Sequence, residues 1–271
     1  MKKVFVSYGD NNFKRSKRRI KREAISSGWF DYIEIFSPEK LTSDFRATFS
    51  SILSYPRGAG YWIWKLDVLE QAFSAISEGD IVVYLDSGCH INHLGAKRFG
   101  DYIEMLRYSE FGFISFQLPH LEKEYTTKEC FDALRIPNDS EIRDSGQINA
   151  TALISKKCDH ALAVVADFRR VLTLDPLIIT DFYNKSQNTF FIDHRHDQSL
   201  LSILRKTHGS LLLQDETYFP IFANPKSNLA TKLIFKLHRK FESPLLDKAY
   251  FARFYSSESS ASPFWALRYR I

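Results

Sequence analysis

The chain has 271 residues, 44% of them hydrophobic and 25% charged, with a formal net charge of +5. This composition is ordinary for a soluble globular protein, and the length suits one large domain or two small ones. No apolar run approaches the ~18 residues of a membrane span, which excludes a transmembrane protein. The three cysteines stand far apart without a CxxC pair, which argues against a disulfide framework and for a reducing compartment. Because no signal-peptide pattern follows the opening Met-Lys-Lys, we expect a cytoplasmic protein.

The first 90 residues alternate between strand and helix patterns. In chain order we expect a strand over 3–8, a helix over 12–28, a strand over 32–37, a short helix and loop over 39–56, a glycine-broken loop over 57–65, a helix over 65–79 and a strand over 80–86. Asn11 or Asn12 is the expected N-cap of the first helix, and Gly28 is its expected stop. Alternation of this kind predicts a parallel sheet covered by helices.

The remainder of the chain is less regular. We expect a helix over 95–108, a strand over 111–118, a polar irregular segment over 119–145, a strand over 147–157, a helix within 156–176 and another from near residue 197. We find no internal repeat and no low-complexity linker. The sequence therefore predicts one domain over residues 1–225, followed by a basic and aromatic extension over 226–271 that contacts a membrane or a partner.

Two regions concentrate positive charge. Seven Lys and Arg residues lie between Lys14 and Arg22, and the C-terminal segments "KLIFKLHRKF" and "FWALRYRI" alternate basic with bulky apolar residues. Either region could meet phosphates, nucleic acid or an anionic membrane surface. A solvated helix face is the alternative for the first cluster.

Asp86 ends the expected strand "DIVVYLD" and is followed by Ser87 and Gly88. A carboxylate at the end of a buried strand is costly unless it is paired, hydrogen-bonded or metal-bound. Gly88 would let another group approach the backbone closely. A divalent cation that holds a diphosphate uses such a carboxylate, whereas capping of the turn after the strand is the alternative.

The loop "RGAGYWIWK" carries a second group of candidates. Arg57 is a fork-shaped donor suited to phosphate, and Trp64 offers a flat surface to a base or a sugar. Lys65 opens the next helix. A loop that its tryptophans pin to the core is the alternative, because no Walker or GxGxxG pattern is present.

The third group lies in "FFIDHRHDQSLL", where charged and polar side chains from Asp193 to Gln198 separate two apolar runs. Asp and His are the usual general bases, and both also bind metals. Asp197 could instead be the N-cap of the following helix, a role that does not exclude catalysis.

Three segments, "YGDNNFKRSKRRIKREA", "RGAGYWIWKLDVLEQAF…GDIVVYLDSGCHIN" and "FIDHRHDQSLLSIL", together resemble bacterial nucleotide-sugar glycosyltransferases of the GT-A fold, more narrowly those of O-antigen and capsule biosynthesis. The resemblance covers most of residues 1–205. It implies an α/β fold with a mixed, Rossmann-like sheet flanked by helices and a helical C-terminal extension. Such enzymes carry a DxD motif that binds Mn²⁺ or Mg²⁺ and the donor diphosphate, but here Gly88 replaces the second acid. The resemblance thus implies a divalent metal on Asp86, with His90 or a residue of the "DHRHD" segment as a further ligand, and a weakly held metal is the alternative.

The resemblance also assigns roles to individual residues. The implied donor-binding residues are Tyr8, Asp10, Arg57, Trp64, Lys65, Asp86, Gly88, Gln147 and Asn149, the last two in the sugar pocket. Asp197 is the preferred catalytic carboxylate, followed by Asp193. Stereochemistry of the transfer, inverting or retaining, stays open.

The implied function is transfer of a hexose from a nucleotide-diphosphate sugar, UDP-linked by preference, to a glycan or lipid-linked oligosaccharide. Such an acceptor lies at the inner face of the cytoplasmic membrane, where the basic and aromatic C-terminal extension would make a peripheral contact. A non-catalytic sugar-binding protein is the first alternative. A nucleic-acid-binding module is the second, but it explains neither Asp86 nor the 57–65 loop, and we expect no nucleic-acid partner.

Overall fold

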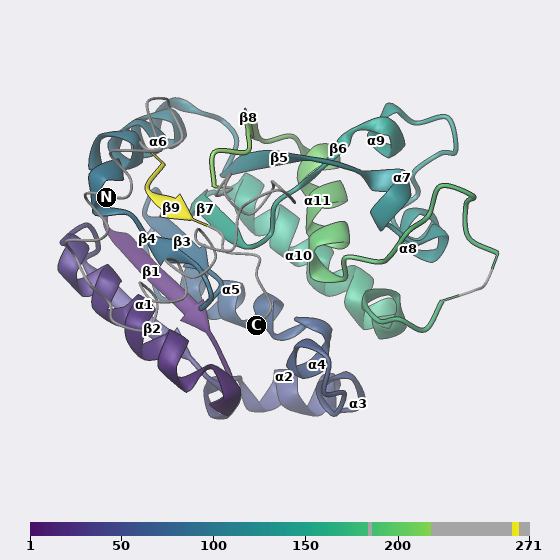
Figure 1. Cartoon of the computed structure of the whole chain (residues 1–271), viewed down its shortest axis with the longest axis horizontal. Coiled ribbons are helices and arrows are strands. Elements are labelled where there is room, and N and C mark those ends of the chain that lie inside the picture. Colours follow the sequence, from purple (N-terminus) through teal and green to yellow (C-terminus); the bar gives the residue numbers. More distant parts are fainter. Residues whose placement is uncertain (184–185, 218–261, 266–271) are drawn as a thin grey trace, which may run out of the picture.

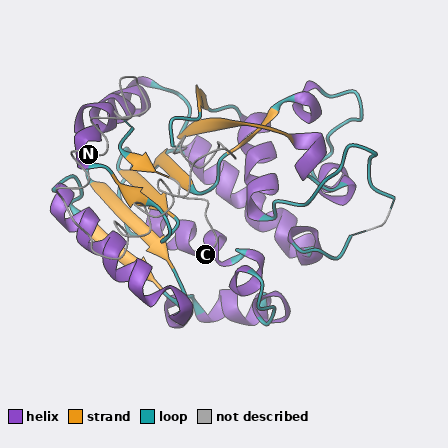
Figure 2. Ribbon diagram, in the orientation of Figure 1, coloured by secondary structure: helices purple, strands orange, loops and turns teal. Residues whose placement is uncertain are grey.

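The structure is a computed structural model that describes residues 1–183, 186–217 and 262–265. Its centre is a seven-stranded mixed sheet with helices packed on both faces (Figure 1). The strands run in the order β2-β1-β3-β7-β5-β6, with β8 paired to β5. Secondary structure is distributed over the whole described chain (Figure 2), and the mixed α/β sheet expected from the sequence is confirmed.

The first half of the sheet is parallel, as predicted. β1 (Lys3–Tyr8) pairs with β2 (Tyr32–Phe36) on one side and with β3 (Ile81–Leu85) on the other. The connecting helices are α1 (Lys14–Ser27) and α5 (Trp64–Ser74). Gly28 ends α1 in the left-handed conformation with φ +66°, which glycine adopts without strain.

The predicted N-cap of the first helix was wrong. Asp10, rather than Asn11 or Asn12, caps a short 3-10 turn, Asn11–Phe13, by accepting a hydrogen bond from the backbone N–H of Asn12 at 2.8 Å. That turn runs directly into α1. Asp10 is thereby engaged in local structure at the end of β1.

The second half of the sheet contains the antiparallel strands. β7 (Ala152–Lys156) runs antiparallel to β3, with Ala152 opposite Leu85. Residues 150 and 151 therefore lie beside Asp86 at one edge of the sheet. β5 (Phe113–Leu121) pairs antiparallel with β7 and with β6 (Gly146–Ile148), and parallel with β8 (Leu211–Gln214).

Two expectations for this half were wrong in detail. The expected strand 147–157 is broken into β6 and β7, which pair with different parts of the sheet. The expected irregular segment 119–145 contains three short helices, α7 (Glu122–Tyr125), α8 (Lys128–Ala133) and α9 (Glu141–Asp144). Similarly, residues 39–56 hold two short helices, α2 (Ser43–Thr48) and α3 (Ser50–Leu53).

The core lies on both faces of the sheet. Alternate residues of β3 point to opposite sides, so Val82 and Tyr84 pack with α5 whereas Ile81 and Val83 pack with α1. α10 (Asp159–Leu174) and α11 (Asp197–His208) cover the first face, and α6 (Ala96–Tyr108) covers the second. Within the described residues, none of the helices combines the length and the apolar character that crossing a bilayer requires.

Most of the predicted extension 226–271 lies outside the described residues, and so does its expected membrane contact. The part that is described, residues 262–265, packs into the domain. There β9 (Phe264–Trp265) pairs antiparallel with β4 (His90–Ile91), and Asn92 donates a hydrogen bond to the carbonyl of Ser262 at 2.9 Å. Phe264 is 1% exposed and packs against Trp29 and Phe99. Phe264 and Trp265 are therefore core residues of the fold.

Gly95 provides a test of this packing. A Cβ atom on Gly95 would lie 2.4 Å from Cα of Pro263, so Gly95→Ala must displace residues 262–265. We expect the substitution to lower the free energy of unfolding by about 1–3 kcal/mol, measured by thermal or urea denaturation. Gly100→Ala in α6 is the matched control, because a Cβ there meets nothing within 4 Å and the helix gains up to about 1 kcal/mol. Equal stability of the two variants would contradict the placement of residues 262–265.

Candidate functional site

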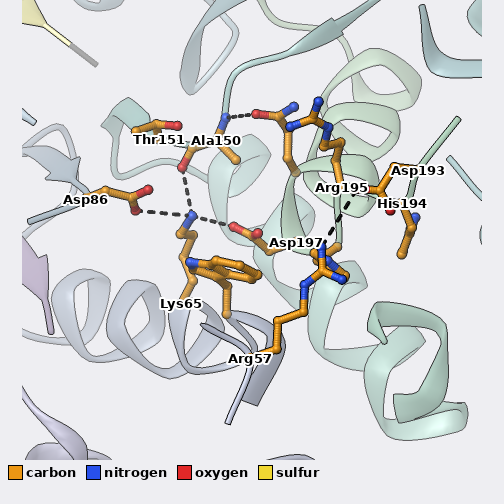
Figure 3. Close-up of a pocket in the computed structure, with 12 residues that line it drawn as sticks. Arg57, Lys65, Asp86, Ala150, Thr151, Asp193, His194, Arg195 and Asp197 are labelled. Atoms are coloured by element: carbon orange, nitrogen blue, oxygen red, sulfur yellow. Dashed lines mark hydrogen bonds and ion pairs between the residues drawn. The ribbon is translucent and has the colours of Figure 1, made fainter. Parts of the chain in front are cut away.

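A cavity of about 220 Å³ opens outside the carboxyl end of β3, at the edge of the sheet where ligands of open α/β folds bind. It is smaller than the ~300–1,000 Å³ of a complete ligand pocket, so it suits one part of a larger ligand. The lining comprises Arg57, Trp62, Lys65, Asp86, Ala150, Thr151 and residues 193–198 (Figure 3). Three groups of candidates from the sequence contribute to this lining: Asp86, the loop 57–65 and the segment 193–198.

Lys65 links the loop 57–65 to Asp86 and to Asp197. Its ammonium donates hydrogen bonds to the carboxylate of Asp197 and, at 2.9 Å, to the carbonyl of Ala150, and it lies 3.6 Å from the carboxylate of Asp86. Figure 3 shows the ammonium between the two acids. Lys65 is only 1% exposed, whereas the side chain of Asp86 is 31% exposed. The lysine therefore forms the floor of the cavity.

Burial and charge act in opposite directions on this group. Desolvation lowers the pKa of Lys65, but the charges of Asp197 and Asp86 together raise it above its ordinary value. Burial raises the pKa of Asp197 to about 6, against the lowering effect of Lys65. Lys65 is thus a permanent cation at neutral pH, and Asp197 is ionised there.

Asp86 lies on a loop that α1 fixes from the opposite side. Arg19 donates hydrogen bonds to the carbonyls of Cys89 at 2.8 Å and Ser87 at 3.0 Å, and it pairs with Glu23 at 2.9 Å. Glu23 accepts from the N–H of Ile91 and lies 2.9 Å from Nδ1 of His90. Burial raises the pKa of Glu23, but His90, Arg19 and the Ile91 N–H together lower it to about 2. Part of the basic cluster of α1 is thus a clamp on the Asp86 loop.

Loss of the Arg19 contacts should loosen that loop. Arg19 is 7% exposed, so Arg19→Gln leaves buried carbonyls without their charged donor. We expect the free energy of unfolding to fall by about 2–4 kcal/mol in urea titrations. The exposed neighbour Arg18 is the matched control, and Arg18→Gln should stay within about 0.5 kcal/mol of the unsubstituted protein. An equal fall in the free energy of unfolding for both variants would show that the positive charge of α1, rather than the hydrogen bonds of Arg19, is what stabilises the fold.

The segment 57–65 enters the site through a strained turn. α4 (Gly58–Tyr61) and the next residue, Trp62, all have positive φ, including the non-glycine residues Ala59 and Tyr61. Such residues cost about 1–2 kcal/mol each, and backbone strain of this kind concentrates at functional sites. The turn aims the ring of Trp62 onto His196, with ring centroids 5.4 Å apart.

Arg57 precedes this turn and faces the carboxylates of Asp181 and Asp193. Its guanidinium lies 2.8 Å from Asp181 and 3.8 Å from Asp193. The Nε atom of Arg57 is buried and has no hydrogen-bond partner among the described residues. Arg57 therefore retains a donor, and its pairing with Asp193 is long enough for an anion to compete.

Two buried histidines anchor the segment that precedes α11 to residues 178 and 179. Nε2 of His194 lies 2.9 Å from the carbonyl of Ile178, and Nδ1 of His196 lies 2.8 Å from the carbonyl of Ile179. Burial lowers the pKa of His194 to about 3 and also lowers the pKa of His196. Both rings are therefore neutral at pH 7 and donate to these carbonyls. His196 is the N-cap residue of α11, so Asp197 is its first helical residue rather than the cap that the sequence left open as an alternative.

Several predicted donor-binding residues lie outside the cavity lining. Tyr8 and Trp64 stack on each other, with ring centroids 3.8 Å apart, and are 4% and 5% exposed. Asp10 caps its own turn, as described above. A Cβ atom on Gly88 meets nothing within 4 Å, so packing does not require a glycine there. Contact of these four residues with a donor stays a prediction.

Gln147 and Asn149 are fully buried beneath the cavity. Gln147 accepts a hydrogen bond from Gln198 at 2.8 Å, and Asn149 accepts one from the N–H of Thr151 at 2.6 Å. Through these bonds they position two lining residues that the sequence did not single out individually, Gln198 and Thr151. Gln198 could have been expected from its place next to Asp197 at the start of a helix, whereas nothing in the sequence marks Thr151.

The acidic residues of the cavity do not fit a resident divalent cation. Among the described residues, no group of three or more His, Cys, Asp or Glu side chains is placed to share a metal ion. Asp86 accepts a hydrogen bond from the hydroxyl of Tyr84 and faces Lys65, and His90 pairs with Glu23. Mn²⁺ and Mg²⁺ take about six ligands, mostly oxygens. The predicted pair of Asp86 and His90 thus lacks a third protein ligand in the described part of the chain.

Comparison with known proteins gives a fold but no family. No protein-family model and no curated protein sequence matches the chain. Among solved structures, mouse xyloside xylosyltransferase 1 is similar with a TM-score of 0.50 and 7% identity, over 99% of this chain and 98% of that one. The glycosyltransferase GlyE of Streptococcus pneumoniae TIGR4 has a TM-score of 0.42 and 16% identity, over 90% of this chain and 52% of GlyE.

The present chain therefore spans about half the length of GlyE. The galactosyltransferase LgtC, solved with donor and acceptor sugar analogues, has a TM-score of 0.40 and 11% identity, over 81% of this chain and 77% of LgtC. At such identities a likeness shows the fold alone. The mixed sheet, its flanking helices and the full-length match to the xylosyltransferase establish a fold of the GT-A type.

Proposed function

We propose that the protein is a glycosyltransferase that takes a sugar from a nucleotide-diphosphate donor. The observation that carries the proposal is the convergence of Asp86, Asp197 and Lys65 with Arg57 at the carboxyl end of β3. This edge of the sheet is where open α/β folds bind nucleotides. A carboxylate pair, a fixed cation and a partly free guanidinium are groups that such a transfer can use.

The transfer separates charge, and each charge has a partner in the cavity. Negative charge develops on the departing nucleoside diphosphate, which the guanidinium groups of Arg57 and Arg195 are suited to bind. Arg195 is exposed and lies over the ring of Tyr125 at 4.6 Å. Asp197 supplies the carboxylate that accepts the acceptor's proton or stabilises the positive sugar carbon. Asp193 is the secondary carboxylate at the mouth of the cavity.

The finer assignment follows the resemblance described above. We propose UDP as the nucleotide carrier and a hexose as the sugar, with a glycan or lipid-linked oligosaccharide as the acceptor. The cavity volume of about 220 Å³ suits a sugar ring or a diphosphate rather than a whole nucleotide sugar. Surface-polysaccharide synthesis at the inner face of the cytoplasmic membrane is the process that uses such acceptors, and it places the protein in the cytoplasm.

Calorimetry with nucleoside diphosphates tests this proposal. UDP, GDP, ADP and CDP are titrated into the full chain, and we expect one of them, UDP first, to bind with a Kd in the micromolar range, about −8 kcal/mol. Single-stranded DNA and RNA of matched charge are the controls. Salt-sensitive binding of nucleic acid without binding of any nucleoside diphosphate would contradict the proposal and favour a nucleic-acid-binding module.

A further inference from the structure

The charges of the cavity balance before any ligand enters. Among the described residues, its lining contains three cationic side chains, Arg57, Lys65 and Arg195, and three anionic ones, Asp86, Asp193 and Asp197. The two histidines are neutral because burial lowers their pKa values. A site built around a resident divalent cation has an excess of carboxylates that the metal neutralises. The lining that the described part of the chain supplies has no such excess.

At the floor of the cavity, Lys65 supplies the positive charge that faces Asp86 and Asp197. Its ammonium donates to Asp197 and to the carbonyl of Ala150, so two of its three N–H bonds are used. The third faces Asp86 at 3.6 Å, which is an ion-pair distance but long for a hydrogen bond. That N–H can therefore be shared between Asp86 and an oxygen atom of a ligand in the cavity.

The position of Lys65 is fixed rather than adjustable. The residue lies in the first turn of α5, and its ammonium packs over the ring of Tyr84 at 5.0 Å from the centroid. Tyr84 in turn donates its hydroxyl hydrogen to Asp86. A cation that bridged Asp86 and Asp197 would have to displace an ammonium that is 1% exposed and held by a carboxylate, a carbonyl and a ring.

We infer that Lys65 takes the place of a divalent cation in this cavity, and that the protein binds its anionic ligand without a metal ion. The ammonium holds Asp86 and Asp197 together and presents one N–H to a diphosphate oxygen, while Arg57 and Arg195 bind the remaining oxygens. The identity of the ligand as a nucleoside diphosphate rests on the proposed function. The statement about the metal does not depend on it.

A titration of manganese alone tests the statement about the metal. Free Mn²⁺ has a sharp electron paramagnetic resonance signal that binding broadens, so no nucleotide is needed. We expect the full chain to leave this signal unchanged at concentrations that saturate ordinary carboxylate sites. A stoichiometric Mn²⁺ site that Asp86→Asn abolishes would overturn the inference, whatever the protein's function.

Binding of UDP in two buffers tests the role of the ammonium. We expect the Kd of the unsubstituted protein to agree within about twofold between EDTA and MnCl₂, a difference below 0.5 kcal/mol. In EDTA, Lys65→Met should weaken binding by about tenfold or more, because the fixed charge is lost and two carboxylates face the ligand uncompensated. Lys65→Arg keeps the charge, so its Kd for UDP in EDTA should lie between the values of the unsubstituted protein and of Lys65→Met.

Lys157→Met is the matched control. Lys157 is half-buried and donates to the carbonyls of Phe73 and Ile76 at 2.6 and 2.7 Å, at the opposite end of β7 from the cavity. The Lys157→Met variant should bind UDP with the same Kd as the unsubstituted protein. Circular dichroism establishes that each variant is folded, and the comparison of buffers on the unsubstituted protein needs no variant.

The outcomes separate the inference from the proposed function. UDP binding that requires manganese, or a folded Lys65→Met that binds UDP in EDTA with unchanged affinity, would overturn the inference and leave the proposed function standing. No binding of any nucleoside diphosphate in either buffer would contradict the proposed function. The manganese titration would still decide whether Lys65 stands where a metal would.

Discussion

Asp197→Asn is expected to lower sugar transfer by about 10²–10⁴-fold, the usual contribution of a positioned acid–base or charge-stabilising group. The amide keeps the shape and one oxygen acceptor for Lys65, but it lacks the negative charge and cannot take up a proton at neutral pH. Affinity for UDP should stay within about threefold, because the substitution removes no donor to a diphosphate. Turnover with a donor sugar and calorimetry with UDP measure the two effects separately.

Asp193→Asn is the comparison for this variant. Its side chain is 44% exposed, against 8% for Asp197, and its nearest cation is Arg57 at 3.8 Å rather than a buried lysine. We expect a loss of turnover of about tenfold or less, within the range of an indirect effect. If the folded Asp197→Asn protein keeps full turnover while Asp193→Asn loses it, the catalytic carboxylate has been assigned to the wrong residue.

Arg57→Ala is expected to weaken binding of UDP by about tenfold to a hundredfold, which corresponds to about 1.5–3 kcal/mol for hydrogen bonds to a charged group. The reason is that Arg57 lines the cavity and has a buried Nε–H without a partner among the described residues. Arg57→Lys should recover only part of the loss, because lysine keeps the charge but lacks the planar fork.

Arg169→Ala is the control for loss of an arginine ion pair elsewhere. Arg169 makes a two-point pair with Glu70 at 2.5 Å between α10 and α5, and neither residue lines the cavity. Its removal should leave the Kd for UDP unchanged. Equal weakening by Arg57→Ala and Arg169→Ala would mean that Arg57 acts through the stability of the fold rather than on the ligand.

The first half of the fold follows from sequence patterns. Apolar runs separated by a helical pattern that ends at Gly28 predict β1, α1 and β2, and the run before Asp86 predicts β3. The position of Asp86 at the carboxyl end of β3 then predicts the location of the cavity. Convergence of this edge with residues near 150 depended on an antiparallel strand, which the pairing of β3 with β7 supplies.

What the sequence did not predict depends on long-range packing. Residues 147–157 contain no glycine or proline that would mark the break between β6 and β7. The break lies at residues 149–151, where the buried side chain of Asn149 hydrogen-bonds to Thr217 and to the N–H of Thr151. Similarly, Tyr8 and Trp64 are aromatic residues of the kind that stack on a ligand, but they stack on each other in the core. Arg19 looked like one of several surface charges, and only its two carbonyl partners distinguish it.

The most direct test of the account is detection of the reaction itself. The full chain and Asp197→Asn are incubated in EDTA with a panel of UDP-, GDP- and CMP-linked sugars together with lipid-linked and free glycan acceptors, and the products are identified by mass spectrometry. We predict one glycosylated acceptor and an equal amount of released nucleotide with the unsubstituted chain, and at least about a hundredfold less with Asp197→Asn. Transfer at equal rates by both proteins, or transfer only after addition of a divalent metal, would contradict a site built from Lys65 and Asp197.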